Sequence, residues 1–241
     1  MRGSKASKAP ESRARPKVLV VDIGGTGVKI LATGETERRR FPSGRKLTPD
    51  KMVANVKKLA KGWAYDVVSI GYPGPVREGR PANDPRNLAR GWLGFNFEKA
   101  FGCPVKVMND AAMQALGSYR GGTMLFLGLG TGLGSALVVR GHIVPMELGH
   151  LAIDGKTFEE ALGNRGLKKV GRKKWGRRVE SATARFVSAL LVDDIVLGGG
   201  NAKKLSRLPR GCRLGDNANA FVGGFRMWED AKTRFSEVPK P

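Results

Sequence analysis

The stretch Asp22-Ile23-Gly24-Gly25-Thr26-Gly27-Val28-Lys29 decides the fold that we predict for this chain. A strand-forming run, residues 18–21, leads into it, and the apolar residues Val28, Ile30 and Leu31 follow the glycines. Apolar runs on both sides of a glycine-rich turn predict a β-hairpin between two buried strands. The glycines leave room for a bulky anion and free N–H groups to point at it. The turn alone leaves two interpretations open, a structural hairpin and a phosphate-binding one.

The side chains of this turn suit phosphate and magnesium chemistry. Asp22 supplies a hard oxygen ligand of the kind that a hydrated Mg²⁺ ion prefers. Thr26 adds a hydroxyl group and Lys29 a positive charge, while Gly24 and Gly25 leave their backbone N–H groups accessible. On the phosphate-binding interpretation, these five residues contact the phosphates and Asp22 is the residue nearest the metal.

Charge is the most unusual property of the composition. The 241 residues include 43 Lys and Arg against 21 Asp and Glu, which gives a formal net charge of +22. So large a surplus favours a polyanionic partner, which could be nucleic acid, a membrane surface or polyphosphate. A solvated basic surface without a ligand is the alternative, and charge alone does not identify the polyanion.

The rest of the composition is that of a globular protein with one or two domains. No apolar run approaches the roughly 18 residues that a membrane-spanning helix needs, and residues 1–17 lack the apolar segment of a secretory signal. Cys103 and Cys212 show no metal-type spacing, so that a reducing compartment, the cytoplasm, is expected. Residues 1–16 are polar and basic and are expected to form a disordered tail.

The second half of the chain repeats the plan of the opening hairpin. Residues 123–129 predict an apolar strand, Gly130-Thr131-Gly132-Leu133-Gly134 a glycine turn, and residues 135–139 a return strand. Two such units predict a duplicated α/β architecture with a cleft between the halves. Neither turn has the spacing of a Walker-type loop or of a dinucleotide fingerprint, since each is followed by a strand. Facing each other, the two turns could hold a chain of phosphates from both sides.

Periodicity and turn residues predict the remaining elements. Thr48-Pro49-Asp50 opens a helix whose apolar face includes Met52 and Val56. Residues 77–98 predict a loop-rich excursion. Further strands are expected at 36–42, 65–70, 105–108 and 195–197, and further helices at 111–119, 157–162, 167–191 and 219–229.

Asn109 and Asp110 stand at the C-terminal end of the strand predicted at 105–108. A carboxylate at the end of a strand, beside a cleft, is well placed to act as a general base for a hydroxyl nucleophile. The alternative is a helix N-cap, for which Asn and Asp are preferred residues. Both can hold at once, because the cap position faces the mouth of the cleft.

Glu147 and His150 lie three positions apart and would share one face of a helical turn. A carboxylate and a neutral imidazole suit sugar hydroxyls. No further Cys or His follows that would complete a zinc site, so no zinc is expected, and a structural His150 is the remaining alternative. Thr157 and Glu160 fit a capping box at a helix start, which leaves Glu159 free for other contacts.

A dense basic run crosses the predicted helix at 167–191, with seven cations in eleven residues. It is either a solvated helix face or a track for a polyanion, and the self-repulsion of so many like charges favours the track. Two more lysines follow the last glycine turn, Gly198-Gly199-Gly200. The residues of the predicted track are Lys168, Lys169, Arg172, Lys173, Lys174, Lys203 and Lys204, and Arg177 and Arg178 complete the run.

Together these motifs resemble the ROK family of sugar kinases, which has the actin-like ATPase (ribonuclease H-like) fold. The resemblance covers about residues 17–229. The opening turn resembles the first phosphate motif of the family, and residues 128–134 resemble the second. The other matching motifs are Gly71-Tyr-Pro-Gly-Pro75, Asn87-Leu88 with Trp92, Asn109-Asp110-Ala111, the sugar-binding motif Glu147-Leu-Gly-His150, and Gly198-Gly-Gly200, which falls where the family contacts the nucleotide.

The resemblance implies two α/β lobes with a central cleft. The small N-terminal lobe would comprise residues 17–109, completed by a C-terminal helix at 217–235, and the large lobe residues 110–216. Asp110 would take the proton from the 6-hydroxyl of the sugar, Mg²⁺ would lie near Asp22, and a homodimer is implied by the resemblance alone. The implied binding residues are Asn109, Asp110, Glu147, His150 and Glu159 for the sugar, and Asp22, Gly24, Gly25, Thr26, Lys29, Gly130, Thr131, Gly132, Gly134, Gly199 and Gly200 for phosphate.

Several features resemble the polyphosphate glucokinase branch of the family. Residues 151–158 contain no cysteine, whereas many members carry a Cys-rich zinc loop there. Residues 144–151, the basic helix with Trp175, and the runs 197–204 and 214–221 are similar to that branch. We therefore predict phosphoryl transfer from inorganic polyphosphate to glucose, with ATP as an alternative donor and no membrane partner. A strictly ATP-dependent glucokinase and a kinase for another hexose are the nearest alternatives.

A non-catalytic protein that binds a polyanion such as nucleic acid is the alternative from a different class. It predicts salt-sensitive binding to DNA or RNA and no dependence on Asp110. No helix-turn-helix precedes the kinase-like residues, which argues against the repressors of the family. Nucleic acid is not expected as the partner.

Overall fold

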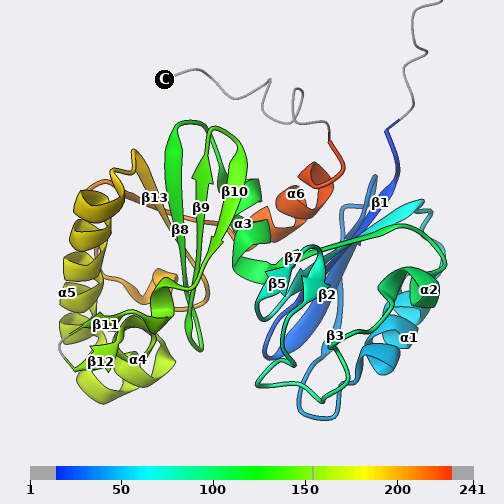
Figure 1. Cartoon of the computed structure of the whole chain (residues 1–241), viewed down its shortest axis with the longest axis horizontal. Helices are drawn as coiled ribbons and strands as arrows, with labels where there is room; N and C mark the ends of the chain where they lie inside the picture. The colour runs from blue at the N-terminus through cyan, green and yellow to red at the C-terminus, as the bar shows by residue number, and fades with distance from the viewer. Residues whose placement is uncertain (1–14, 154, 230–241) are drawn as a thin grey trace, which may run out of the picture.

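The computed structural model describes residues 15–153 and 155–229. They form two five-stranded sheets that lie side by side with helices between and around them (Figure 1), so the predicted α/β class is confirmed. Most of the predicted tail, residues 1–14, lies outside the described residues, as do residues 230–235 of the predicted C-terminal helix.

The first sheet is built around the strand that precedes the opening glycine turn. All six residues of β1 are buried, because β1 lies in the interior of the sheet and both of its faces are covered. It pairs antiparallel with β2 and parallel with β4. The strands, in spatial order, are β3 (Arg39–Pro42), β2 (Gly27–Ala32), β1 (Val18–Ile23), β4 (Val67–Tyr72) and β7 (Val105–Asn109).

The second sheet has the same strand order and the same pattern of parallel and antiparallel pairing. This confirms the repeated plan that the two glycine turns predict. Two of its strands, at the two edges of the sheet, were not predicted. The strands, in spatial order, are β10 (His142–Met146), β9 (Leu133–Val139), β8 (Thr123–Leu129), β13 (Asp194–Gly198) and β14 (Cys212–Leu214).

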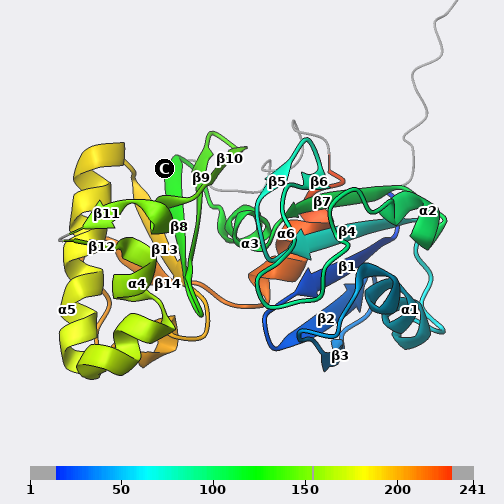
Figure 2. The same cartoon turned by 60° about the horizontal axis from the view of Figure 1, so that its bottom comes forward.

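Helices cover the outer face of each sheet and fill the space between the sheets (Figures 1 and 2). Helices α1 (Pro49–Leu59) and α2 (Phe97–Phe101) share a core cluster with the first sheet, and α4 (Phe158–Leu162) and α5 (Asn164–Leu190) with the second. Helices α3 (Asp110–Ser118) and α6 (Asn219–Arg226) pack against each other between the sheets. The remaining short elements are β5 (Val76–Arg77), β6 (Arg80–Pro81), β11 (Ala152–Ile153), β12 (Lys156–Thr157) and the 3₁₀ turns η1 (Leu148–His150) and η2 (Ala202–Lys204).

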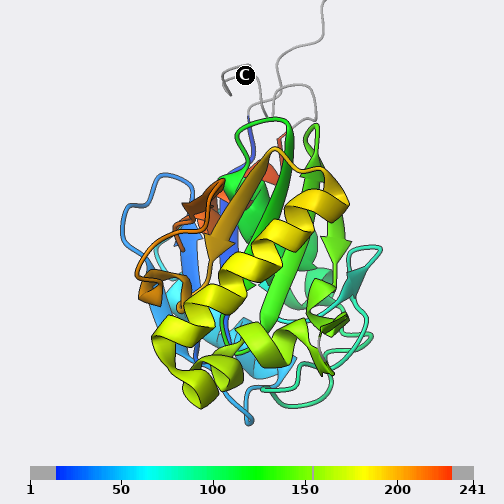
Figure 3. The same cartoon turned by 90° about the vertical axis from the view of Figure 1, so that its left-hand side faces the viewer.

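Helix α5 runs diagonally across the second sheet (Figure 3). The prediction of one continuous helix at 167–191 is wrong in one respect, because Gly171 interrupts α5 with φ 72° and ψ 165°. Glycine adopts positive φ without the steric cost that other residues pay. Beyond this break Trp175 is fully buried and its Nε1 donates to the Leu162 carbonyl (2.9 Å), which fixes α5 against α4. Within the described part of the chain, no helix has the length and apolar character of a bilayer span.

Glycines allow α3 and α6 to approach at backbone distance. A Cβ atom on Gly117 would meet the Asn219 carbonyl, and one on Gly223 would meet the Met113 carbonyl. A Cβ atom on the next residue, Gly224, would likewise meet the side chain of Val20 in β1. Helix α6 is therefore wedged between α3 and the first sheet with no room for side chains at these positions.

Gly223→Ala is expected to lower the free energy of unfolding by about 1–3 kcal/mol, because overpacking forces these backbones apart. Gly176→Ala is the matched control within a helix, since its Cβ would lie 3.8 Å from the nearest atom, a Leu205 methyl group. That change should be neutral or stabilise by up to about 1 kcal/mol. Urea unfolding of both variants measures the difference, and equal effects would contradict the close approach.

Candidate active site

The opening glycine turn joins β1 to β2 and is held closed by backbone contacts. The N–H of Gly24 donates to the Gly27 carbonyl (3.0 Å), so the prediction that this N–H is free for an anion is wrong, because the turn closes on it. The Ser43 hydroxyl donates to the Gly24 carbonyl (2.8 Å). Asp22 is buried at the end of β1, opposite Lys29 in the β1–β2 register, and the Lys29 ammonium lies 3.6 Å from its carboxylate. Burial raises the pKa of Asp22, and the Lys29 charge acts in the opposite direction.

The second glycine turn joins β8 to β9 and is fixed by two asparagines that sequence reasoning missed. The Gly130 carbonyl accepts the backbone N–H of Asn164 (2.9 Å), at the start of α5, and the side-chain amide of Asn201 (3.1 Å). Asn201 is itself buried, and its carbonyl oxygen accepts a hydrogen bond from the Lys204 ammonium (2.8 Å). A polar residue directly after Gly198–Gly200 was the available sequence signal for Asn201.

Gly199 brings the turn after β13 against the end of β8. It has φ 79°, and a Cβ atom there would clash with the Leu129 backbone. Only glycine meets both requirements, and it allows the turn after β13 to approach this closely. The predicted phosphate residues Gly199 and Gly200 therefore lie next to the turn that contains Gly130, Thr131 and Gly132.

Asn109 is the N-cap of α3, which is the alternative that the sequence left open. Its side-chain oxygen accepts the N–H groups of Ala111 (3.0 Å) and Ala112 (3.1 Å), and its amide donates to the Gly74 carbonyl (3.0 Å). These bonds tie the start of α3 to the loop after β4. Contact between Asn109 and a sugar hydroxyl stays a prediction.

Asp110 lies where the two sheets meet, at the first position of α3. Its pKa is raised to about 7, chiefly by burial and then by the negative charges of Asp22 and Glu147. The N–H of Ala111 donates to its carboxylate (2.8 Å) and opposes the rise. The fold thus gathers one carboxylate from the first sheet, one from η1 beside the second sheet, and Asp110 between them.

Three of the residues predicted to hold sugar hydroxyls, Glu147, His150 and Glu159, lie in or beside segments that contact the second glycine turn. Glu147 and His150 are the two exposed ends of a single 3₁₀ turn, where the His150 N–H donates to the Glu147 carbonyl (3.0 Å). The Glu159 carboxyl carbon lies 2.9 Å from the position of a Cβ on Gly132. The predicted capping box between Thr157 and Glu160 is confirmed, which leaves the Glu159 carboxylate free to face Gly132.

A magnesium ion fits the chemistry of this site when a phosphate donor supplies the other ligands. Within residues 15–153 and 155–229, no group of three or more His, Cys, Asp or Glu side chains is placed to hold a metal alone. Mg²⁺ is often held by one or two carboxylates together with substrate phosphates and water. Asp22 and Asp110 each have a raised pKa and repel each other, and a nearby cation would relieve that repulsion.

The basic run lies on α5, on both sides of the break at Gly171, and all of its residues but the half-buried Arg178 are exposed. Leu205, directly after η2, contacts the helix at Gly176, so that the two lysines of η2 lie near the middle of α5. Of the track residues, Lys204 is tied to the second glycine turn through Asn201. The exposed track residues are Lys168, Lys169, Arg172, Lys173, Lys174, Lys203 and Lys204.

Arg86 is a further charged residue that sequence reasoning missed. It stands in the loop after β6, and its guanidinium lies 3.3 Å from the Glu159 carboxylate of α4. The pair therefore joins a loop of the first sheet to a helix of the second. The available signal was its position directly before the family motif Asn87-Leu88.

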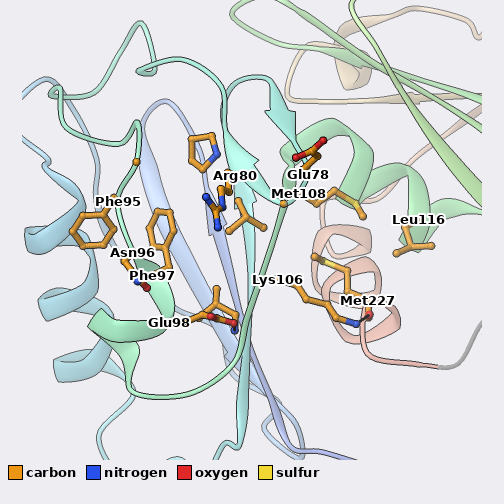
Figure 4. A pocket seen from close by; sticks show the side chains of 15 residues that line it. Glu78, Arg80, Phe95, Asn96, Phe97, Glu98, Lys106, Met108, Leu116 and Met227 are labelled. Atoms are coloured by element: carbon orange, nitrogen blue, oxygen red, sulfur yellow. Dashed lines mark hydrogen bonds between the residues drawn. The ribbon is translucent and has the colours of Figure 1, made fainter.

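A pocket of about 550 Å³ follows β7, the edge strand of the first sheet (Figure 4). Its lining includes Arg80, Phe97, Lys106 and Met227, and it contains none of the predicted site residues. We place the candidate site at Asp110 and the two glycine turns instead, because the interacting carboxylates lie there beside the turns that are predicted to bind phosphate.

Raising the pH from about 4 to about 7.5 is expected to lower the free energy of unfolding through Asp110, by on the order of 4 kcal/mol. A carboxyl group with a higher pKa in the folded than in the unfolded state favours folding while protonated, and this contribution is lost as the pH rises through about 7. Asp110→Asn should therefore be more stable than the wild type at the higher pH only. Urea unfolding at both pH values measures this, and identical pH dependence would contradict it.

Known proteins share this arrangement over most of the chain. The inorganic polyphosphate/ATP-glucomannokinase of Arthrobacter sp. strain KM superposes with a TM-score of 0.75 and 26% identity, over 87% of this chain and 96% of that one. A ROK family glucokinase from Streptomyces griseus, solved with glucose and AMPPNP, gives a TM-score of 0.70 at 17% identity, over 88% and 99%. These likenesses confirm the predicted actin-like ATPase fold.

Sequence comparison agrees with the structural one. The polyphosphate glucokinase of Mycobacterium tuberculosis is 26% identical over 231 residues, which cover 85% of each chain. Residues 18–170 match the model of the ROK family, and this match includes both glycine turns, Asp110, and the Glu147–His150 turn. The chain therefore belongs to the ROK family.

Proposed function

We propose that this protein transfers a phosphoryl group from inorganic polyphosphate to the 6-hydroxyl of glucose, with ATP as an alternative donor. The observation that carries the proposal is the position of Asp110, between two glycine turns and beside the Glu147–His150 turn. A base with a pKa near the working pH combines a useful ionised fraction with a strong drive to accept the proton. Asp110, with a pKa of about 7, meets this requirement.

The proposed roles of the other residues follow from phosphoryl transfer, which depends on positioning and charge neutralisation. Glu147, His150, Glu159 and Asn109 would orient the sugar so that its 6-hydroxyl faces Asp110. The N–H groups of both glycine turns would hold the donor phosphates with Lys29 and Thr26, apart from those of Gly24 and Gly130, which already donate to carbonyls within the turns. Asp22 would hold Mg²⁺, which when bound neutralises phosphate charge. Closure over the sugar would exclude water as a competing acceptor.

Three observations support polyphosphate as the donor. The net charge is +22. The track residues of α5 and η2 lie exposed, α5 begins with Asn164 bound to the second glycine turn, and Lys204 is linked to that turn through Asn201. The Mycobacterium and Arthrobacter relatives are a polyphosphate glucokinase and a polyphosphate/ATP-glucomannokinase by name. We propose that a long phosphate chain leaves the turn along this track.

We also propose a division into two lobes, residues 17–109 together with α6, and residues 110–216; within the described residues the predicted C-terminal helix is shorter than expected, since α6 ends at Arg226. Helix α6 packs against α3 of the second lobe and also against β1 and β4, and the contacts with these two strands support assigning it to the first lobe. A cytoplasmic location and a homodimer remain predictions.

A matrix of donors against acceptors, assayed with Mg²⁺, tests the proposed function. Long-chain polyphosphate and ATP are the donors, and glucose, mannose, fructose and N-acetylmannosamine the acceptors. Glucose phosphorylation with polyphosphate is expected to be the fastest reaction. Turnover with ATP alone would overturn the donor assignment, and another preferred sugar would overturn the acceptor. No turnover, together with salt-sensitive binding to DNA or RNA, would favour a non-catalytic protein.

A further inference from the structure

The loop that carries Arg86 is held firmly at both of its ends. The Tyr72 hydroxyl donates to the Asn83 carbonyl (2.6 Å). The Asp84 carboxylate accepts the N–H groups of Gly91 (3.1 Å) and Trp92 (2.8 Å), which closes residues 84–92 into a compact loop. Trp92 is fully buried against the Tyr72 ring, with the ring centroids 5.7 Å apart. This loop is therefore anchored to the core of the first sheet.

Its interior residues are anchored as well, which leaves the tip to face the second sheet. Pro85 and Leu88 are buried, and the Ala89 N–H donates to the Leu47 carbonyl (3.2 Å). Between them, Arg86 and Asn87 are exposed. The structure thus presents two polar side chains on a fixed base.

The tip reaches both glycine turns. The Asn87 amide lies 3.8 Å from the position of a Cβ on Gly25, in the first turn. The Arg86 guanidinium lies 3.3 Å from the Glu159 carboxylate, which in turn lies against Gly132 of the second turn. Arg86 is therefore placed where the two proposed phosphate-binding turns approach each other.

We propose that Arg86 is a phosphate-binding residue of the donor site, and that Glu159 restrains it until the sugar binds. The inference rests on the proposed function, in which Glu159 contacts a sugar hydroxyl. When the sugar takes the Glu159 carboxylate, the guanidinium is released to a phosphate oxygen of the donor. A planar guanidinium binds phosphate through two parallel hydrogen bonds, and its charge does not titrate.

The properties of the ion pair suit such an exchange. The Arg86 side chain is 81% exposed and that of Glu159 34%, and exposed pairs contribute little net stability. Two other cations near the turns, Lys29 and Lys204, already contact Asp22 and Asn201, so that they can bind phosphate only together with or in place of these contacts. Arg86 can change partners without breaking either turn.

The exchange predicts that sugar and donor tighten each other's binding, because coupling between two sites is reciprocal. Titration calorimetry with Mg²⁺ measures the affinity for inorganic tripolyphosphate, which is too short to cover the basic helix. The titrations are run with and without 6-deoxyglucose, which lacks the accepting hydroxyl. In the wild type the sugar is expected to tighten tripolyphosphate binding by about 5- to 10-fold. Arg86→Gln should reduce this coupling to less than about 2-fold.

Glu159→Gln is expected to tighten tripolyphosphate binding in the absence of sugar, a change that a merely structural role of Glu159 would not produce. Without its restraint, Arg86 should bind tripolyphosphate in the absence of sugar as tightly as the wild type does with sugar. Arg90→Gln is the matched control, because Arg90 is an exposed arginine of the same loop, and it should keep the wild-type coupling.

Two results would overturn the inference: unchanged coupling in Arg86→Gln, or equal loss of coupling in Arg90→Gln, which would reduce the effect to net charge. Thermal melting of each variant establishes that it is folded. The donor and acceptor assay of the wild type tests the proposed function separately. A wild type that phosphorylates no sugar refutes that function, whereas an active wild type without Arg86-dependent coupling refutes only the role of Arg86.

Discussion

Asp110→Asn is expected to lower the kcat for glucose phosphorylation by about 10²- to 10⁴-fold, the usual contribution of general base catalysis. The amide cannot accept the proton of the 6-hydroxyl at neutral pH. It can still accept the N–H of Ala111 that the carboxylate accepts now, so the start of α3 should keep its geometry. Glucose binding should therefore change by no more than a few-fold. Steady-state kinetics and calorimetric titration with glucose separate the two effects.

The matched control is Asp50→Asn, because Asp50 is an exposed aspartate in the first turn of another helix, α1. It should leave kcat unchanged within experimental error. In the wild type, kcat/KM for glucose should rise about tenfold per pH unit below pH 7 and level off above it, since the base must be ionised. A kcat for Asp110→Asn close to that of the wild type would refute Asp110 as the base.

Neutralising the basic track is expected to raise the KM for long-chain polyphosphate by about 10- to 100-fold, by analogy with counterion release from nucleic acids. The variant replaces five exposed cations with glutamine. ATP is too short to follow the track, so the KM for ATP should change by less than about 2-fold. The dependence of the polyphosphate KM on salt should also become shallower. The replaced residues are Lys168, Lys169, Arg172, Lys173 and Lys174.

A second five-residue variant controls for net charge. It replaces exposed lysines on or beside α1, which covers the outer face of the first sheet. Its KM for polyphosphate should stay within about 3-fold of the wild type, the small change that a weaker overall field produces. If the KM for polyphosphate rises to the same extent in both variants, the surface acts through its net charge alone and no track exists. The control residues are Lys46, Lys51, Lys57, Lys58 and Lys61.

Short stretches of sequence predicted the elements that depend on interactions between neighbouring residues. The glycine turns, their flanking apolar strands and the capping box at Thr157 were found where the residues indicated them. The edge strands β10 and β14 were missed, because their residues are only partly buried and lack a clear alternating pattern. The break at Gly171 was missed because a glycine within a helical pattern is tolerated in many helices.

The sequence by itself determined the hairpins, the order of the motifs and the identity of the candidate base, because each depends on residues that are neighbours along the chain. Only the tertiary structure decided what those groups can do. The pKa of Asp110 is set by burial and by Asp22 and Glu147, which belong to distant parts of the chain. The Arg86–Glu159 pair likewise joins two distant segments. Electrostatic interactions depend on distance in space and on the local dielectric, and neither is encoded in the spacing of residues along the sequence.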